Sequence, residues 1–130
     1  MLPEANRLAK VRDFNLILKH GRYYKGQFLD LRLLELAKIT PYFPKKEDPE
    51  EFVKQLRLAL AVGLKVSKSA VKRNRTKRQL REVLRPLLKK NRIQNGLYLL
   101  FVARPQILEK DFAQISQETE LLLAKAKVLI

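Results

Sequence analysis

One segment of this sequence, residues 65–92, restricts the possible folds more than any other. It carries twelve lysines and arginines and a single acid, Glu82, so most of the net charge of +15 lies in less than a quarter of the 130 residues. Five side chains within it recur at helical spacing: Thr76, Leu80, Val83, Leu84 and Leu87. We therefore expect an amphipathic helix over about 67–91 whose apolar side packs on another layer of the protein. Pro86 lacks a backbone N–H, and we expect it to kink or break this helix near Arg85.

The other side of the expected helix is strongly basic. Asn74, Arg78, Arg81 and Arg85 follow the spacing i, i+4, i+7 and i+11, which predicts an outer stripe, with Arg73 and Lys77 at its border. Like charges at this spacing repel one another unless counterions are present. Phosphates would remove the repulsion, and the planar fork of arginine suits bidentate phosphate contacts. The pattern favours a polyanionic partner over a merely solvated basic face.

The rest of the chain predicts strands and two further helices. Residues 11–20 have helical apolar spacing and end before Gly21, and 111–127 form a second helix with Phe112, Ile115, Leu122 and Ala126 on one face. Residues 23–25 suggest a short strand, and 57–64 and 97–103 suggest interior strands. Residues 28–36 alternate, with Leu29, Leu31 and Leu33 on one face and Asp30 and Arg32 on the other, which is typical of a half-buried strand.

The order of these elements predicts the fold class. Helix, strands, helix, strand and helix are best accommodated by a single mixed sheet with helices packed on it, an α+β domain spanning 1–130. Residues 40–55 carry three prolines and many charges, and we interpret them as a surface loop. Within that loop Asp48 and Pro49 could start one helical turn.

No feature of the sequence predicts a self-contained active site. There are no cysteines, so disulfides and thiolate metal sites are excluded, and His20 is the one histidine, which we expect to cap the first helix. The acids Glu47, Asp48, Glu50 and Glu51 lie on the proline-rich loop and are interpreted as a solvated turn, not a metal site. We predict no catalytic residue and no metal ligand in the chain. No apolar run has the length of a membrane helix and no secretory signal is visible, so we expect a cytoplasmic protein.

Four aromatic residues are candidates for stacking on single-stranded bases: Tyr23, Tyr24, Phe28 and Phe101. Phe101 lies within an apolar run, which favours a place in the core. Tyr23 and Tyr24 lie beside Arg22 and Lys25, and for them stacking and a structural role remain equally open.

Several ordered motifs resemble the protein subunit of bacterial ribonuclease P. The run Arg73-Asn74-Arg75-Thr76-Lys77-Arg78, followed by Arg81, resembles that family's RNR motif. Asn6-Arg7-Leu8, then Asp13-Phe14 and Gly21, resembles its N-terminal signature, and residues 97–105 resemble its last strand. The resemblance covers most of the chain.

This resemblance implies a compact α/β sandwich of order αβββαβα with a left-handed βαβ crossover. It implies a catalytic RNA as partner and precursor tRNA as substrate, whose 5′ leader is removed by hydrolysis with Mg²⁺ held by the RNA; the protein alone binds no cofactor. The residues that it implies for RNA contact, together with neighbouring lysines and Arg85, are Lys65, Lys68, Lys72, Arg73, Asn74, Arg75, Lys77, Arg78, Arg81 and Arg85. The leader cleft that it implies contains Phe14, Leu18, Leu31, Arg73 and Lys77, with Leu18 and Leu31 standing where relatives commonly have aromatics.

Three other classes of protein fit parts of the pattern. A structural RNA-binding protein of ribosomal or ribosome-assembly type fits composition and charge equally well, and only the ordered motifs argue against it. A DNA-binding regulator is disfavoured because no helix-turn-helix is evident, and DNA is not an expected partner. A helix lying on a membrane surface is disfavoured because the strands need the apolar side of the basic helix for a core.

Overall fold

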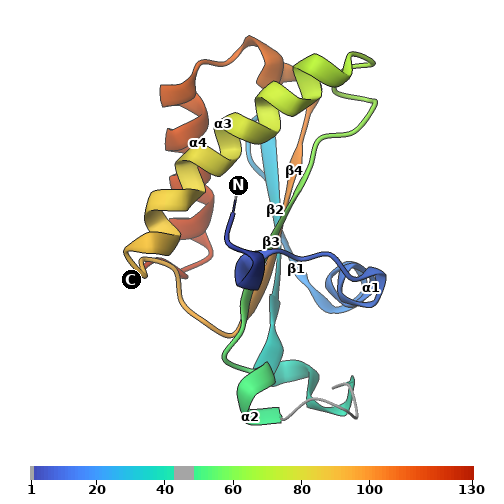
Figure 1. Cartoon of the computed structure of the whole chain (residues 1–130), viewed down its shortest axis with the longest axis vertical. Coiled ribbons are helices and arrows are strands. Elements are labelled where there is room, and N and C mark those ends of the chain that lie inside the picture. Colours follow the sequence, from blue (N-terminus) through green and yellow to red (C-terminus); the bar gives the residue numbers. More distant parts are fainter. Residues whose placement is uncertain (1, 43–48) are drawn as a thin grey trace.

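A four-stranded sheet forms the centre of the protein, and the computed structural model describes residues 2–42 and 49–130 of it (Figure 1). The strands are β1 (Arg22–Tyr24), β2 (Leu29–Glu35), β3 (Leu56–Ala61) and β4 (Leu97–Ala103), in the spatial order β1-β2-β4-β3. β2 pairs antiparallel with β1 and with β4, whereas β3 and β4 are parallel. The sheet is therefore mixed, as the order of elements predicted.

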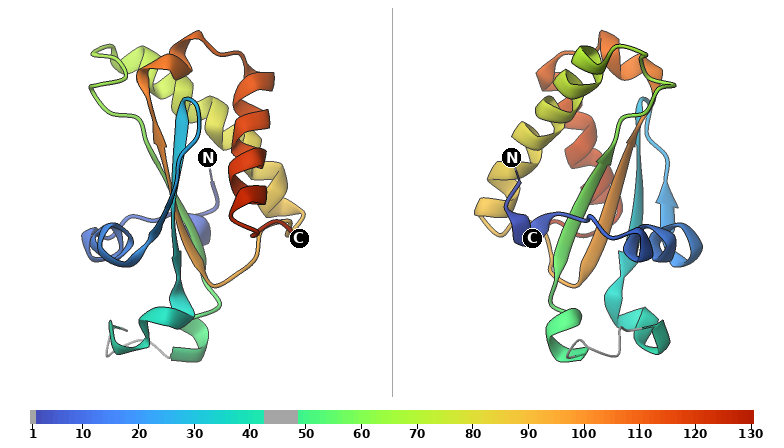
Figure 2. Two further views of the ribbon diagram at one scale, coloured as in Figure 1. Left: turned by 180° about the vertical axis from the view of Figure 1, so that it is seen from behind. Right: turned by 45° about the vertical axis from the view of Figure 1, so that its right-hand side comes forward.

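Helices cover both faces of the sheet. α3 (Ala70–Lys89) and α4 (Phe112–Lys125) lie on one face and α1 (Val11–His20) on the other, so the molecule has three layers (Figures 1 and 2). Short helical segments complete the chain: η1 (Glu4–Asn6), η2 (Leu36–Tyr42), α2 (Pro49–Phe52) and η3 (Pro105–Glu109). Without these short segments the order is αβββαβα, which confirms the predicted fold class.

Each face of the sheet has its own apolar core. Leu31, Phe101, Leu58, Leu80 and Ile115 belong to the larger cluster beneath α3 and α4. A second cluster joins α1 to the opposite face and includes Ile17, Leu34, Tyr98 and Leu100. Phe101 is fully buried, as its apolar run predicted.

The prediction of a half-buried β2 was wrong. Leu31 and Leu34 are both buried, on opposite faces of the strand, and even Asp30 is only 6% exposed. The reason at Leu34 is α1, whose Ile17 belongs to the same apolar cluster on the face that alternation assigned to solvent. Asp30 is tolerated there because its carboxylate accepts a hydrogen bond from Gly26 N (3.1 Å) and pairs with Arg104 (3.4 Å).

The boundaries of α3 also differ from the prediction. It begins at Ala70, after the turn that contains residues 64–66, and it runs through Pro86 to Lys89 without a break. A proline has no N–H to donate to the carbonyl of the preceding turn. Beyond Pro86 the helical hydrogen bonds continue, since Lys90 N donates to Pro86 O (3.0 Å). Of the two predicted outcomes, the break is therefore wrong, and the kink stays a prediction.

Two further predictions concern the apolar face of α4 and the helical turn near Pro49. The first is wrong at one residue, and the second lies partly outside the described residues. Of the residues expected on the buried face of α4, Ile115 and Leu122 are buried as predicted, whereas Phe112 is 48% exposed; α4 also buries Leu123. Phe112 directly follows the capping residue Asp111, so it lies at the end of the helix before the apolar face begins. The helical turn expected near Pro49 is present as α2, whereas its proposed cap, Asp48, and the acid Glu47 are outside the described residues.

Candidate nucleic-acid interface

The basic helix α3 is fixed to the sheet by its apolar side and capped by serines. Ser69 Oγ accepts a hydrogen bond from Lys72 N (3.4 Å), and Ser67 Oγ accepts one from Ser69 N (3.1 Å). The four buried residues of α3 are Thr76, Leu80, Val83 and Leu84. Burying two fully enclosed leucines contributes about 1.5–3 kcal/mol each, so the orientation of the helix about its axis is well determined.

The basic residues predicted from the sequence occupy the remaining surface of α3 and the turn before it. The basic side chains that are exposed are Lys65, Lys68, Lys72, Arg75 and Arg78, and the neutral Asn74 is exposed with them. Those that are half-buried are Arg73, Lys77, Arg81 and Arg85. The predicted outer stripe is thus exposed at Asn74 and Arg78 and half-buried at Arg81 and Arg85.

Carboxylates neutralise very little of this charge. Arg85 Nη1 lies 3.1 Å from Oε1 of Glu82, and both side chains are close to half exposed. An exposed pair of this kind contributes about 0–1 kcal/mol. Within the ranges 2–42 and 49–130, no other cation of α3 has an ion pair, so the helix presents an uncompensated positive field to solvent.

Arg73 has an unusual environment. It is half-buried, and its Nε is enclosed without a hydrogen-bond partner among the described residues. An enclosed N–H that lacks a partner is costly, by about 1–3 kcal/mol.

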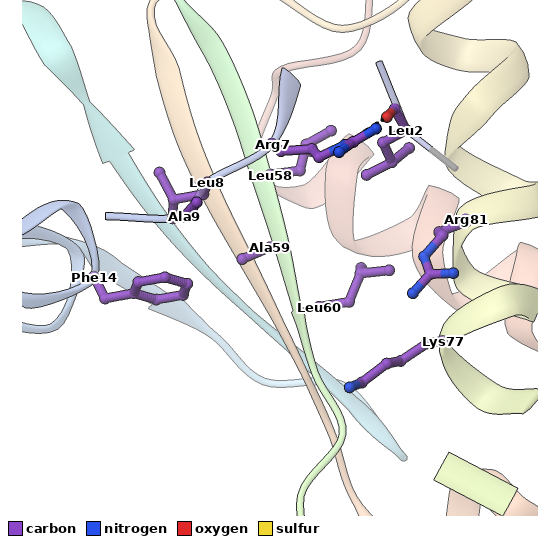
Figure 3. A pocket seen from close by; sticks show the side chains of 10 residues that line it. All are labelled: Leu2, Arg7, Leu8, Ala9, Phe14, Leu58, Ala59, Leu60, Lys77 and Arg81. Atoms are coloured by element: carbon purple, nitrogen blue, oxygen red, sulfur yellow. Dashed lines mark hydrogen bonds between the residues drawn. The ribbon is translucent and has the colours of Figure 1, made fainter. Parts of the chain in front are cut away.

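A cavity of about 310 Å³ lies where α1, α3 and the N-terminal segment meet at the edge strand β3. Figure 3 shows Phe14 on one side of β3 and Lys77 and Arg81 extending toward it from α3 on the other. The residues lining this cavity, called here the β3-edge cavity, are Leu2, Arg7, Leu8, Ala9, Phe14, Leu58, Ala59, Leu60, Lys77 and Arg81. Its floor is apolar, and it offers one aromatic ring and three cations.

The N-terminal segment, residues 2–9, forms one wall of this cavity by pairing with β3. Leu8 N donates to Leu58 O (2.9 Å), and Asn6 Nδ2 donates to Leu56 O (2.7 Å). Arg7 is held in turn, because its Nε donates to Leu2 O (2.8 Å). The pairing covers the edge of β3 and brings Arg7 into the cavity, a place that periodicity could not have predicted.

The structure brings together only part of the predicted leader cleft. Phe14 and Lys77 line the β3-edge cavity, whereas Arg73 does not. Leu18 is 54% exposed on α1, one turn after Phe14, and does not line it either. The assignment of Leu31 was wrong: it is fully buried against α3 and α4, because odd-numbered residues of β2 face away from α1.

Tyr23, one of the aromatic candidates, lies on the α1 side of the sheet, and its contacts with Arg32 and Asp30 were not predicted. The guanidinium of Arg32 lies 5.2 Å from the ring centroid of Tyr23, which is 51% exposed. A hydrogen bond to Asp30, reinforced by desolvation and the charge of Asp30, raises the pKa of Tyr23 above its ordinary value of 10.0. Of the other aromatic candidates, Tyr24 is half-buried and Phe28 is buried, with Lys110 over its ring.

Neither a metal cluster nor a membrane helix is evident in the part of the chain that the structure describes. Residues 2–42 and 49–130 contain no group of three or more His, Asp or Glu side chains placed to hold a metal ion. None of their helices has the length and apolar character needed to cross a bilayer.

Comparison with known proteins gives one consistent result. A family model described as Ribonuclease P matches residues 2–127. A ribonuclease P protein component from Pseudanabaena sp. (strain PCC 6903) is 33% identical, covering 99% of this chain and 97% of the relative. That from Nostoc punctiforme (strain ATCC 29133 / PCC 73102) is 36% identical, covering 98% of this chain and 95% of the relative.

Solved structures agree in fold. The chain is similar to a Staphylococcus aureus RNase P protein with a TM-score of 0.75 and 25% identity, covering 98% of this chain and all of that one. The RNase P protein from Thermotoga maritima has a TM-score of 0.70 at 24% identity, covering 92% and 96% of the two chains, and supports the fold alone.

Proposed function

The chain belongs to the ribonuclease P protein family, whose role is the 5′ processing of tRNA, and we propose that it binds both the RNA subunit and the 5′ leader of precursor tRNA. Endonucleolytic removal of the leader to give mature tRNA is the reaction that it assists. The match extends over nearly the whole chain. A ribosomal or ribosome-assembly role, which composition alone allowed, is not favoured.

The observation that supports RNA binding most strongly is the division of α3 into two faces. Leucines fix one face to the sheet, while Asn74, Arg75 and Arg78 are exposed on the other, and in the described part of the chain neither arginine forms an ion pair with a carboxylate. A polyanion would relieve the repulsion between these cations and release counterions from the RNA.

We assign the leader to the β3-edge cavity. Phe14 supplies an aromatic face for a base on one side of β3, and Arg7, Lys77 and Arg81 supply charges for phosphates in the same cavity. Base stacking on an aromatic side chain is worth about 1–3 kcal/mol and tolerates any base. Such a site suits a single strand whose sequence differs from one precursor to the next.

We place the hydrolytic chemistry in the RNA partner, with Mg²⁺ held by RNA, and the holoenzyme in the cytoplasm. In this assignment α3 binds the RNA subunit and the β3-edge cavity binds the leader of the precursor tRNA, so the protein positions one RNA against the other. No side chain of the protein acts on the scissile bond. The protein raises activity by lowering the electrostatic cost of bringing two polyanions together.

Reconstitution tests the proposal. Purified protein is expected to leave precursor tRNA uncut, whereas protein together with ribonuclease P RNA from the same genome is expected to cleave it at a magnesium concentration where the RNA alone is slow. Cleavage by the protein alone, or no stimulation of the RNA, would refute the proposed role.

A further inference from the structure

We infer that α3 carries a second anion site, on the flank opposite Phe14, which binds one phosphodiester of the RNA subunit between α3 and the segment that connects η3 to α4. The inference rests on the proposed function and extends it to a residue outside the basic motif, Lys110. The site is a cavity of about 120 Å³ lined by Lys72, Arg75, Thr76, Gln79, Leu108 and Lys110. We call it the Lys110 cavity.

The Lys110 cavity is separate from the β3-edge cavity. The two share no lining residue. On α3, Lys77 and Arg81 point to one flank, toward β3, whereas Lys72, Arg75 and Gln79 occupy the other, toward η3. A strand bound along α3 therefore has phosphate sites on both sides of the helix.

Lys110 is held in place by its surroundings, unlike an ordinary surface lysine. It ends η3, where its N–H donates to the carbonyl of the buried Ile107 (3.1 Å). Its ammonium lies 5.5 Å from the ring centroid of Phe28, itself buried. The side chain is half-buried, so less conformational entropy is lost when it binds an anion.

The charge of the Lys110 cavity is unbalanced. Lys72, Arg75 and Lys110 have no ion pair with any carboxylate in the ranges 2–42 and 49–130. The acid that follows Lys110 is engaged elsewhere, because the Asp111 carboxylate accepts a hydrogen bond from Gln114 N (2.8 Å) and caps α4. Three cations on two walls of one small cavity are the arrangement that a phosphate stabilises.

A double-mutant cycle on RNA binding tests the inference. The variants are Lys72→Met, Lys110→Met and the two combined, since methionine keeps an unbranched apolar stem and removes the charge. Lys125→Met is the matched control: Lys125 is exposed at the far end of α4 and lines neither cavity. The affinity of each protein for ribonuclease P RNA from the same genome is measured between 50 and 200 mM salt, with circular dichroism to check folding.

A plot of the logarithm of the binding constant against the logarithm of the salt concentration has a negative slope. Losing one phosphate contact should make this slope shallower by about 0.7–0.9, which corresponds to roughly five- to eightfold weaker binding at 0.1 M salt. We expect this loss for each single variant, no loss for Lys125→Met, and retention of affinity by Lys110→Arg. Because one phosphate needs both walls, the double variant should lose less than the product of the two single losses.

The inference is overturned if Lys110→Met binds like the wild type, if Lys125→Met loses as much, or if the two single losses multiply, which would mean independent contacts. Failure of the wild-type protein to bind the RNA would instead contradict the proposed function. If Lys110→Met does not fold, Lys72→Met and Lys110→Arg still test the site.

Discussion

Replacing Leu80 or Arg78 with alanine should distinguish the roles of the two faces of α3, one in stability and the other in RNA binding. Leu80 is fully buried in the cluster beneath α3, and Arg78 is exposed one half-turn away. A buried leucine cut to alanine loses transfer free energy and leaves a cavity, at a cost of about 3–4 kcal/mol. Arg78→Ala removes an exposed side chain that forms no ion pair, so it should change the free energy of unfolding by less than about 0.5 kcal/mol.

RNA affinity should show the opposite order. Arg78→Ala should weaken RNA binding roughly five- to eightfold at 0.1 M salt, through the loss of one phosphate contact. Leu80→Ala should bind nearly as the wild type while it is folded, because a typical domain stability of about 5–15 kcal/mol exceeds the loss.

Urea denaturation and equilibrium RNA binding on the same preparations measure both effects. The slope of the unfolding free energy against urea should stay constant for both variants, so that midpoints report stability. A loss below about 1 kcal/mol for Leu80→Ala, or an equal loss of stability for Arg78→Ala, would refute the division of α3 into an anchoring face and a binding face.

Three further changes test other parts of the account. Phe14→Ala should weaken binding of precursor tRNA by about 1–3 kcal/mol and leave binding of leaderless tRNA unchanged; an equal effect on both would contradict the leader assignment. Glu118→Gln should destabilise the fold by about 1–3 kcal/mol, because its two carboxylate oxygens accept backbone N–H groups at 2.8 and 2.9 Å in the β1–β2 connection, and an unchanged urea midpoint would exclude that role. Gly96→Ala should cost more than about 1 kcal/mol, since φ is +82° and a Cβ would lie 2.6 Å from Val53 O; full stability in thermal unfolding would contradict it.

The sequence was sufficient to predict α3 and its two faces. The leucine spacing and the charge clustering are local signals, and the structure confirms that Leu80 and Leu84 are buried on one face of α3 and that cations are exposed on the other. The Asp111–Gln114 capping box that starts α4 is also a local pattern, although it was not among the predictions. Local periodicity failed at β2, because whether its second face is buried depends on α1, an element packed there from another part of the chain.

The candidate cavities depend on contacts that no local pattern encodes. Arg7 reaches the β3-edge cavity because the N-terminal segment pairs with Leu58, some fifty residues away. Lys110 joins Lys72 only because η3 returns the chain to the flank of α3. Leu31 was assigned to the leader cleft from a family resemblance, which can identify the strand that contributes to a cleft. Neighbouring residues of a strand face opposite sides of the sheet, so an error of one residue places the side chain on the wrong face.

The salt dependence of RNA binding by the wild-type protein is the most direct test of the account. If α3 and its flanks replace about six counterions on the RNA, affinity should fall on the order of a thousandfold between 50 and 200 mM salt. A complex whose affinity hardly changes over that range would mean that the cations of α3 do not contact phosphates, and would contradict the account.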